Sequence, residues 1–169
     1  MYKKQQNTEN KKSLLDSQTI NISRVTKVTK GGRHFRLAAT VVVGNRKGLV
    51  GIGTGKANEF QDAVRKAELA ANKNVVRIAL IDNRTIPHEA IAKVGRAQVM
   101  LKPAKEGNGI VAGGAARAVL ELAGVKDIVA KSLGSNTKLN VAKATLEALK
   151  MQKSPQHVAT LRGKKVEEL

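Results

Sequence analysis

The chain has 169 residues, with 31 Lys and Arg against 13 Asp and Glu, so its formal net charge is +18 and its isoelectric point lies near 10.5. Such strong self-repulsion indicates a polyanionic partner, and the spread of the cations along the chain favours nucleic acid over a membrane surface. The sequence has no Cys, which excludes a disulfide framework, a thiolate metal site and a thiol nucleophile. Aromatic residues make up only 2% of the chain, which argues against a module that stacks unpaired bases on aromatic side chains.

The first segment, residues 1–19, is polar and poor in apolar residues, and we expect it to form a disordered basic arm. Neither a secretory leader nor a long uncharged apolar run is apparent, so we expect a soluble chain. Val, Ile and Thr dominate residues 20–30, which predicts a strand. Its apolar positions change phase, and a bulge near Arg24 would explain the shift.

The next strand is predicted over residues 33–43, where the side chains alternate with a period of two. This pattern indicates one packed face and one wet, basic face. One face carries Arg33, Phe35, Leu37, Ala39, Val41 and Val43, and the other begins with His34, Arg36, Ala38 and Thr40. Glycine-containing cationic turns stand before and after the strand, at residues 29–33 and 44–48, so two consecutive hairpins are expected.

The third strand has glycine at alternate positions, Gly51, Gly53 and Gly55, which leaves one of its faces bare. Either a packed helix or a nucleic-acid backbone could approach such a face, and the sequence leaves both open. We expect Asn58 to cap the following helix and Lys56 to stand just before its N-terminus, where a phosphate is favoured. The segment is not an NTPase loop, because Val50 replaces the first glycine and Ala57 the magnesium-binding hydroxyl. The apolar stripe of the helix is Phe60, Ala63, Val64, Ala67 and Ala71.

A second set of elements begins at residue 75. It comprises a turn at residues 82–85, strands near 86–93, 96–102 and 127–133, a small-residue helix over 113–123 that Gly124 ends, and a helix carrying Val141 and Leu149. Ser154 and Pro155 open a last helix, which ends at Gly163. The sequence therefore predicts an α+β fold of two small domains: residues 20–74, with a three-stranded antiparallel sheet and a helix, and residues 75–163, followed by a tail over 164–169.

No arrangement of residues indicates catalysis. Gly107, Gly109, Ala112 and Asp127 imitate a dinucleotide fingerprint, but the link from the preceding strand is too long and the remaining chain too short for a doubly wound sheet. The three histidines are far apart and lack metal-ligand spacing. We expect no enzyme activity, no cofactor, no metal and no small-molecule substrate.

The cations of the first half are the candidate functional residues. Two cationic turns and a lysine near a helix start form a spaced set that suits the phosphate backbone of a helical nucleic acid. The predicted RNA-binding residues are Arg24, Lys27, Lys30, Gly31, Gly32, Arg33, Arg36, Arg46, Lys47 and Lys56.

Three segments resemble bacterial-type small-subunit ribosomal protein five over about residues 20–169. The N-terminal domain of that family is matched by SRVTKVTKGGRHFRLAATVVVGNRKGLVGIGTGKANEFQDAVRKA, its C-terminal domain by LKPAKEGNGIVAGGAARAVLELAGVKDIVAKSLGSNTKLNVAKATLEAL, and its ending by SPQHVATLRGKKVEEL. The resemblance implies a first domain similar to a double-stranded-RNA-binding domain and a second α+β domain with a βαβ core.

The resemblance also implies a structural component of the small ribosomal subunit, which binds its rRNA and supports assembly, in the cytoplasm or in an organelle. Its neighbours would be ribosomal proteins four and eight and the mRNA entrance path. The loop matching Thr26 to Arg33 would reach head and neck rRNA and affect spectinomycin sensitivity. Gly107, Gly109 and Arg117 would contact protein four and influence decoding accuracy. The alternatives are a free double-stranded-RNA-binding assembly factor or regulator, and a nucleotide-using enzyme at residues 107–112.

Overall fold

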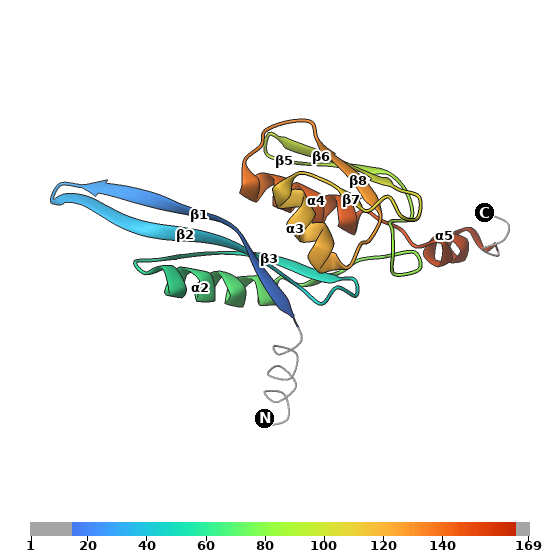
Figure 1. Cartoon of the computed structure of the whole chain (residues 1–169), viewed down its shortest axis with the longest axis horizontal. Helices are drawn as coiled ribbons and strands as arrows, with labels where there is room; N and C mark the ends of the chain where they lie inside the picture. Colours follow the sequence, from blue (N-terminus) through green and yellow to red (C-terminus); the bar gives the residue numbers. More distant parts are fainter. Residues whose placement is uncertain (1–14, 165–169) are drawn as a thin grey trace, which may run out of the picture.

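The computed structural model describes residues 15–164, which form two α+β units packed on each other (Figure 1). The first unit contains β1 (Asp16–Thr29), β2 (Gly32–Gly44), β3 (Leu49–Ala57), α2 (Phe60–Lys73) and β4 (Val76–Arg77). The second contains β5 (Ala90–Val94), β6 (Ala97–Pro103), β7 (Ile110–Val111), α3 (Gly114–Ala123), β8 (Ile128–Ser132), α4 (Lys138–Lys150) and α5 (Pro155–Arg162). Within residues 15–164, no helix is long and apolar enough to span a bilayer.

The first sheet is antiparallel and has the strand order β1-β2-β3-β4. It holds the three expected strands and adds the short β4, which pairs with the start of β3 and lies beyond the expected domain boundary at residue 74. β1 begins at Asp16, so residues 16–19, expected in the arm, belong to a strand. The rest of that arm, residues 1–14, and the tail after residue 164 lie outside the described residues.

The irregularity of β1 lies between Thr19 and Asn21, so the prediction of a bulge near Arg24 is wrong. Ile20 is the residue left without a partner in the ladder, and it packs against the buried cluster that joins the two units. The change of phase seen in the sequence therefore reflects one side chain that leaves the sheet pattern to enter this core.

Helix α2 lies directly on the glycine-bearing face of β3. A Cβ atom added to Gly51, Gly53 or Gly55 would stand 2.5, 2.2 or 2.4 Å from a carbonyl oxygen of this helix. The close approach anticipated from the glycines is therefore made by a packed helix and not by nucleic acid. The prediction of Asn58 as the helix cap is wrong, because α2 begins at Phe60 and Glu59 takes the cap position.

The face of the first sheet that points away from α2 is exposed to solvent only near one end. Thr40 and Val42, which lie on the face expected to be solvated, are 7% and 0% exposed. Val50 and Ile52 of β3 are buried with Val42 in a cluster shared with α3 and α4. The prediction of a fully wet face is therefore wrong over residues 40–43. The second unit covers this part of the sheet, while residues 32–36 remain exposed.

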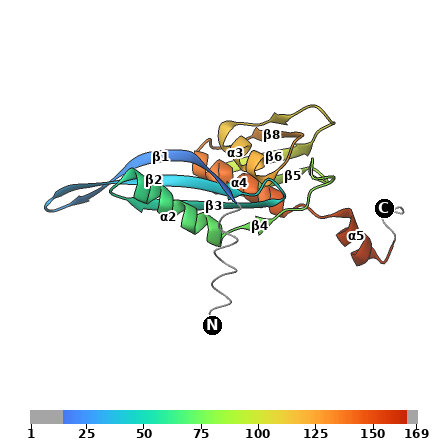
Figure 2. The same ribbon diagram turned by 60° about the horizontal axis from the view of Figure 1, so that its bottom comes forward.

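The second sheet has the strand order β5-β6-β8-β7, and β7 and β8 are parallel. The segment β7-α3-β8 is therefore the expected βαβ unit, and the predicted α+β fold is confirmed. The inward side chains of β6, Ala97, Val99 and Leu101, are fully buried. The layers run from α2 through the first sheet and the pair α3 and α4 to the second sheet (Figures 1 and 2).

The turn between β2 and β3 fastens the two units together. The backbone N–H groups of Arg46 and Gly48 donate to the carbonyl oxygens of Leu122 and Ala123, at 2.9 and 2.8 Å. Gly124 ends α3 with φ +88°, and a Cβ there would lie 2.1 Å from the carbonyl oxygen of Arg46. This glycine therefore serves the end of the helix and the contact between the units together.

Candidate nucleic-acid interface

The outer half of the β1–β2 hairpin projects from the body of the molecule (Figures 1 and 2). The two strands stay paired without interruption from the pair Asn21 and Thr40 to the pair Thr29 and Gly32. Gly32 has φ +128°, a conformation that side chains strongly disfavour, and the hydroxyl of Thr29 donates to its carbonyl oxygen at 3.2 Å. Lys30 and Gly31 lie at the tip of the hairpin, where both are exposed.

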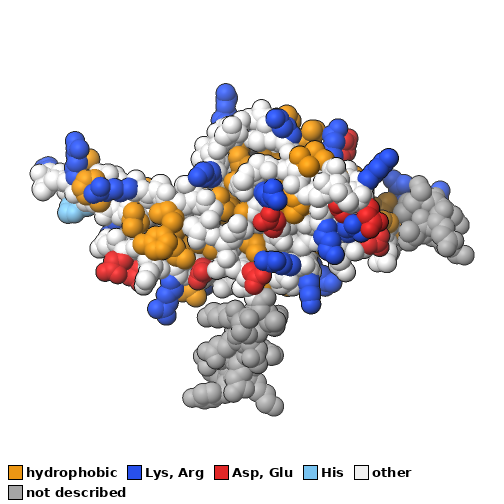
Figure 3. Space-filling model, in the orientation of Figure 1, with side chains coloured by type: hydrophobic (Ala, Val, Ile, Leu, Met, Phe, Trp, Pro, Cys, Tyr) orange, Lys and Arg blue, Asp and Glu red, His pale blue; other side chains and the backbone are white. Residues whose placement is uncertain are grey.

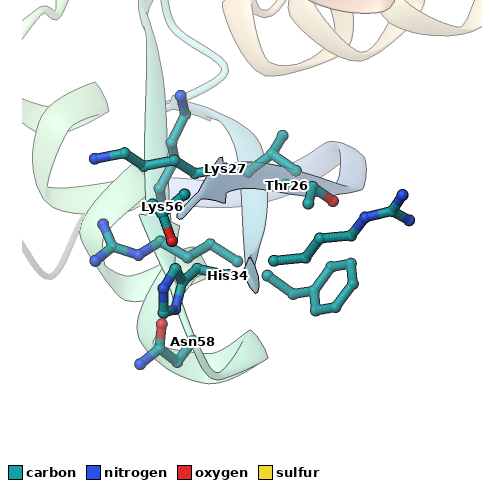
Figure 4. Close-up of a pocket in the computed structure, with 10 residues that line it drawn as sticks. Thr26, Lys27, His34, Lys56 and Asn58 are labelled. Carbon is teal, nitrogen blue, oxygen red and sulfur yellow. The ribbon is translucent and has the colours of Figure 1, made fainter. Parts of the chain in front are cut away.

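A pocket opens along this hairpin beside the end of β3 (Figure 4). We call it the basic pocket, because four of its lining side chains are cations and its lining includes no carboxylate. The lining residues are Val25, Thr26, Lys27, Thr29, Arg33, His34, Phe35, Arg36, Lys56 and Asn58. Positive charge in a hollow without a neutralising acid favours a bound anion, and phosphate is the anion that a nucleic acid supplies in series.

The strand register explains why these cations gather. Lys27 stands opposite His34, and Lys56 stands opposite Ala38, which is two residues from Arg36 along β2. Directly paired residues and residues two apart share a face of a sheet, so Lys27, His34, Arg36 and Lys56 lie on the same face. Arg33 alternates onto the other face of β2 and lines the pocket near the hairpin tip. This is the face that α3 and α4 cover farther along the strands, and most of the lining of the basic pocket belongs to its uncovered continuation.

The other face of the hairpin carries a different contact. The guanidinium carbon of Arg24 lies 3.7 Å from the centroid of the Phe35 ring, which is 46% exposed. A cation over an aromatic face is stabilised by the ring quadrupole, and the stack also limits the rotamers of Arg24. Two predicted residues, Arg24 and Arg36, therefore serve opposite faces of the hairpin.

The second cationic turn lies away from the basic pocket. Successive hairpin turns fall at opposite ends of the strand they share, and a 13-residue strand such as β2 spans roughly 40 Å. Arg46 forms an ion pair with Asp16 at 3.0 Å, and Lys47 is exposed. The structure therefore gathers Lys27, Arg33, Arg36 and Lys56 and leaves this turn separate. Lys56 lies within β3, four residues before α2, and not at the helix start that we expected.

A partly buried ion pair holds the glycine loop of the second unit. Asp127, only 2% exposed, accepts from Arg84 Nε at 2.5 Å and from the backbone N–H of Gly109 at 2.9 Å, while Arg84 also contacts Glu106. The hydrogen bond from Arg84 and then that from Gly109 hold the pKa of Asp127 below its usual range. The sequence did not reveal this pairing, because its two members are 43 positions apart.

The predicted residues of the second unit lie around the same loop, with Gly107 and Arg117 exposed and Gly109 half-buried. Gly107 and Gly109 have φ of +86° and +73°, and the space where a Cβ would stand is open at both. Arg117 lies in the first half of α3 and donates to Glu121 at 2.7 Å. Across residues 15–164, no group of three or more His, Asp or Glu side chains could hold a metal ion.

The cations are not confined to the hairpin. Figure 3 shows Lys and Arg side chains across the whole visible face, with the acidic side chains in smaller groups among them. The projecting hairpin bears cations, and so does the body that carries the second sheet. A long-range positive field of this kind attracts a polyanion to the whole molecule, while the basic pocket supplies local contacts.

Comparison with known families divides the chain in the same way as the two units. Residues 15–79 match the family described as ribosomal protein S5, N-terminal domain, and residues 92–162 match ribosomal protein S5, C-terminal domain. Together the two matches cover most of the chain and fall on the two sheets in order. The chain therefore belongs to the ribosomal protein S5 family, as a structural, non-enzymatic protein of the small ribosomal subunit that binds rRNA and other ribosomal proteins.

Proposed function

We propose that the chain grips small-subunit rRNA through its projecting hairpin, supports subunit assembly, and helps to set decoding accuracy near the mRNA entrance path. The observation that carries this proposal is the basic pocket, whose lining holds four cations and no carboxylate. The pocket lies on the β1–β2 hairpin, which extends beyond the body of the molecule. Its cations could therefore enter a groove between RNA segments that is too narrow for the two domains. The predominance of Lys and Arg favours contacts with phosphates over base readout.

Binding to a small-subunit rRNA fragment, measured across a range of salt concentrations, tests the role of the pocket. Replacing Lys27 and Lys56 by Ala should weaken binding and reduce the salt slope by about two units, because about one unit is lost for each phosphate contact. The control pair is Lys73→Ala with Lys143→Ala, which removes the same charge from exposed positions on α2 and α4. Equal slopes for the two variants would mean that the basic pocket makes no phosphate contacts.

Two further variants distinguish the contribution of the hairpin tip to RNA binding from that of the turn between β2 and β3. Lys30→Ala with Arg33→Ala should also weaken binding and flatten the salt slope, because both side chains lie at the exposed end of the hairpin. Arg46→Ala with Lys47→Ala tests the turn at the other end of β2. A loss for this variant as well would require an rRNA that touches both ends of the strand, as the original set of predicted residues implies.

We further propose that the loop at Gly107 and Gly109, together with Arg117, contacts ribosomal protein four, and that ribosomal protein eight is a second neighbour. The open space above both glycines and the exposure of Arg117 support a contact there. Binding of purified ribosomal protein four should weaken for Arg117→Ala and stay unchanged for Lys73→Ala. Misreading of a reporter codon by cells carrying each variant measures the effect on accuracy, and spectinomycin resistance of Lys30→Ala measures the role of the tip.

Sedimentation of a native lysate through a sucrose gradient after a high-salt wash distinguishes the structural role from that of a free assembly factor. A permanent component should remain with small subunits at about one copy each, since many phosphate contacts act together. Release by salt, or presence on immature particles alone, would indicate the free RNA-binding factor. The same sedimentation, carried out separately on cytosol and on purified organelles, tests whether these ribosomes work in the cytoplasm or in an organelle.

A further inference from the structure

The outward face of the second sheet is a second candidate binding surface. Its inward side chains pack on α3 and α4, and Figures 1 and 2 show both helices on that side. The outward positions carry apolar residues where a solvated antiparallel sheet ordinarily carries polar ones. We call this surface the outer face, and it consists of Ile91, Lys93, Gln98, Met100, Lys102, Val111, Val129, Lys131 and Leu133.

The outer face holds three of the ten large hydrophobic side chains that are exposed in residues 15–164. Ile91 is 52% exposed, Val111 is 51% exposed and Leu133 is 53% exposed. Single exposed apolar side chains are normal on a protein surface, but several on one sheet indicate an interaction site. The three come from β5, β7 and the residue that follows β8, so the exposure extends across the width of the sheet.

The strand register places Ile91 and Val111 in one apolar stripe with Met100 and Val129. Ile91 stands opposite Met100, and Val129 stands beside Val111 in the next row of the sheet. Met100 and Val129 are diagonal neighbours, because Lys131 faces Met100 and lies two residues beyond Val129. Neighbouring side chains on one face are about 5–8 Å apart, so an apolar stripe crosses all four strands.

Lysines flank this stripe. Lys131 on β8 pairs with Met100, at one side of the stripe. Lys102 on β6 pairs with Val129, at the other side. Lys93 lies two residues after Ile91 on β5. Glu89 reaches Lys102 at 3.7 Å. Within residues 15–164, neither Lys93 nor Lys131 has an ion-pair partner.

We infer that the outer face docks a protein that presents an apolar ridge flanked by carboxylates. An RNA backbone would neutralise the lysines, but it would bring charged phosphates against the apolar stripe and gain nothing from covering it. A protein surface can satisfy both parts, because interfaces place apolar groups at the centre and charges at the rim. The partner is therefore recognised by its apolar centre and by its acidic rim.

This surface is separate from the proposed RNA contact. The basic pocket lies on the hairpin of the first sheet, whereas the outer face belongs to the far layer of the second sheet (Figure 1). Helices α3 and α4 stand between the two sheets. RNA and a protein partner can therefore bind at the same time, and the chain would join them.

Photo-cross-linking in cells tests this inference on the full chain. A benzophenone side chain introduced in place of Ile91 reacts with whatever covers the outer face, and the same group in place of Leu161 is the matched control, since Leu161 is a 67% exposed apolar residue on α5. The lysate of the irradiated cells is separated on a sucrose gradient, and every fraction is collected. Mass spectrometry identifies the cross-linked species as RNA or as a peptide. Separately, the fraction of the chain in small subunits reports on the proposed ribosomal role.

The expected result is an adduct from position 91 to a peptide in which apolar residues adjoin Asp or Glu. Lys131→Glu should reduce its yield about tenfold or more, because like charges would then face each other across the interface. Lys143→Glu, on the exposed side of α4, should leave the yield unchanged. Three outcomes at position 91 would overturn the inference: an adduct to RNA, an adduct to a peptide without acidic residues, or no adduct. This holds whether or not the chain sediments with small subunits, so the test is independent of the proposed ribosomal role.

Discussion

The Nε atom of Arg84 donates to Oδ2 of Asp127 at 2.5 Å, although the two residues are 43 positions apart. The surrounding backbone strengthens this link, because the carbonyl oxygen of Arg84 accepts from the N–H of Lys126 at 2.7 Å and the hydroxyl of Thr85 donates to the carbonyl oxygen of Asp127 at 2.7 Å. The turn that leads into the second unit is thereby tied to the start of β8. The glycine loop joins the same arrangement through Gly109.

Asp127→Asn should change how stability depends on acidity. The pKa of Asp127 is lowered in the folded protein, first by Arg84 and then by Gly109, so its ionised form stabilises the fold at neutral pH. That stability is present above the unfolded carboxyl pKa, about 3.9, and is lost as the pH falls through the lower folded value. Urea unfolding between pH 7 and pH 3 should therefore show a steeper loss for the wild type than for Asp127→Asn.

Glu147→Gln is the control for this acid effect, because Glu147 is a partly exposed carboxylate paired with Lys150 on the surface of α4. Its pH curve should follow that of the wild type closely, since exposed pairs contribute little. Parallel curves for Asp127→Asn and the wild type would show that the Arg84–Asp127 pair does not govern acid stability.

Gly53→Ala should destabilise the protein by about 1–3 kcal/mol or more, because the new methyl group would enter the backbone of α2. Its Cβ would lie 2.2 Å from both the carbonyl oxygen of Ala67 and the nitrogen of Ala71. Gly31→Ala is the matched control, since no atom lies within 4 Å of a Cβ at that position. Thermal unfolding of the two variants measures the difference, and equal melting temperatures would contradict the close helix packing.

The Arg24–Phe35 stack should show a coupling energy of about 0.5–1 kcal/mol in a double-mutant cycle, as expected for an exposed cation–π pair. The cycle uses Arg24→Gln, Phe35→Leu and the double variant, with free energies from urea unfolding. Arg36→Gln combined with Phe35→Leu is the control cycle, because Arg36 lies on the opposite face of β2. A similar coupling in both cycles would mean that the stack makes no specific contribution.

Ser154→Ala should loosen α5 without unfolding the protein. The Ser154 hydroxyl accepts from the backbone N–H of His157 at 3.2 Å, and only Ala159 of this helix is buried. Loss of such a cap costs about 1 kcal/mol, so exchange of the α5 amide hydrogens should accelerate about fivefold. Thr160→Ala, which removes a hydroxyl bonded within the helix to Gln156, is the comparison. Unchanged exchange in Ser154→Ala would show that the cap is dispensable.

Elements with strong local signals were predicted well. The strand predicted near residues 96–102 is β6, because the apolar residues Ala97, Val99 and Leu101 alternate with a period of two and are the side chains that it buries. Ser154, Pro155 and Gly163 marked both ends of α5, since each residue favours one backbone conformation. The cations of the hairpin were found from the sequence for the same local reason, whereas their gathering with Lys56 needed the register of three strands.

The errors came from contacts between distant residues. The run Val41-Val42-Val43 signalled that both faces of β2 are buried at this point, but a strict alternation was fitted through it. The separation of the two cationic turns followed from the topology of consecutive hairpins and could have been predicted. The Arg84–Asp127 pair and the bulge at Ile20 could not, because each depends on how the second unit packs.

The shared cluster beneath α3 and α4 has a consequence during synthesis. The first sheet is complete on the nascent chain before the helices that cover Val42 and Ile52 have been translated, and α4 ends only at Lys150. At about 5–20 residues per second, the roughly 70 residues between the end of β4 and the end of α4 take about 4–15 s to appear. Throughout that interval, an apolar sheet face stands open beside the translating ribosome. The nascent chain therefore passes through a partly folded stage with an exposed apolar surface, which a chaperone or an early RNA contact must cover.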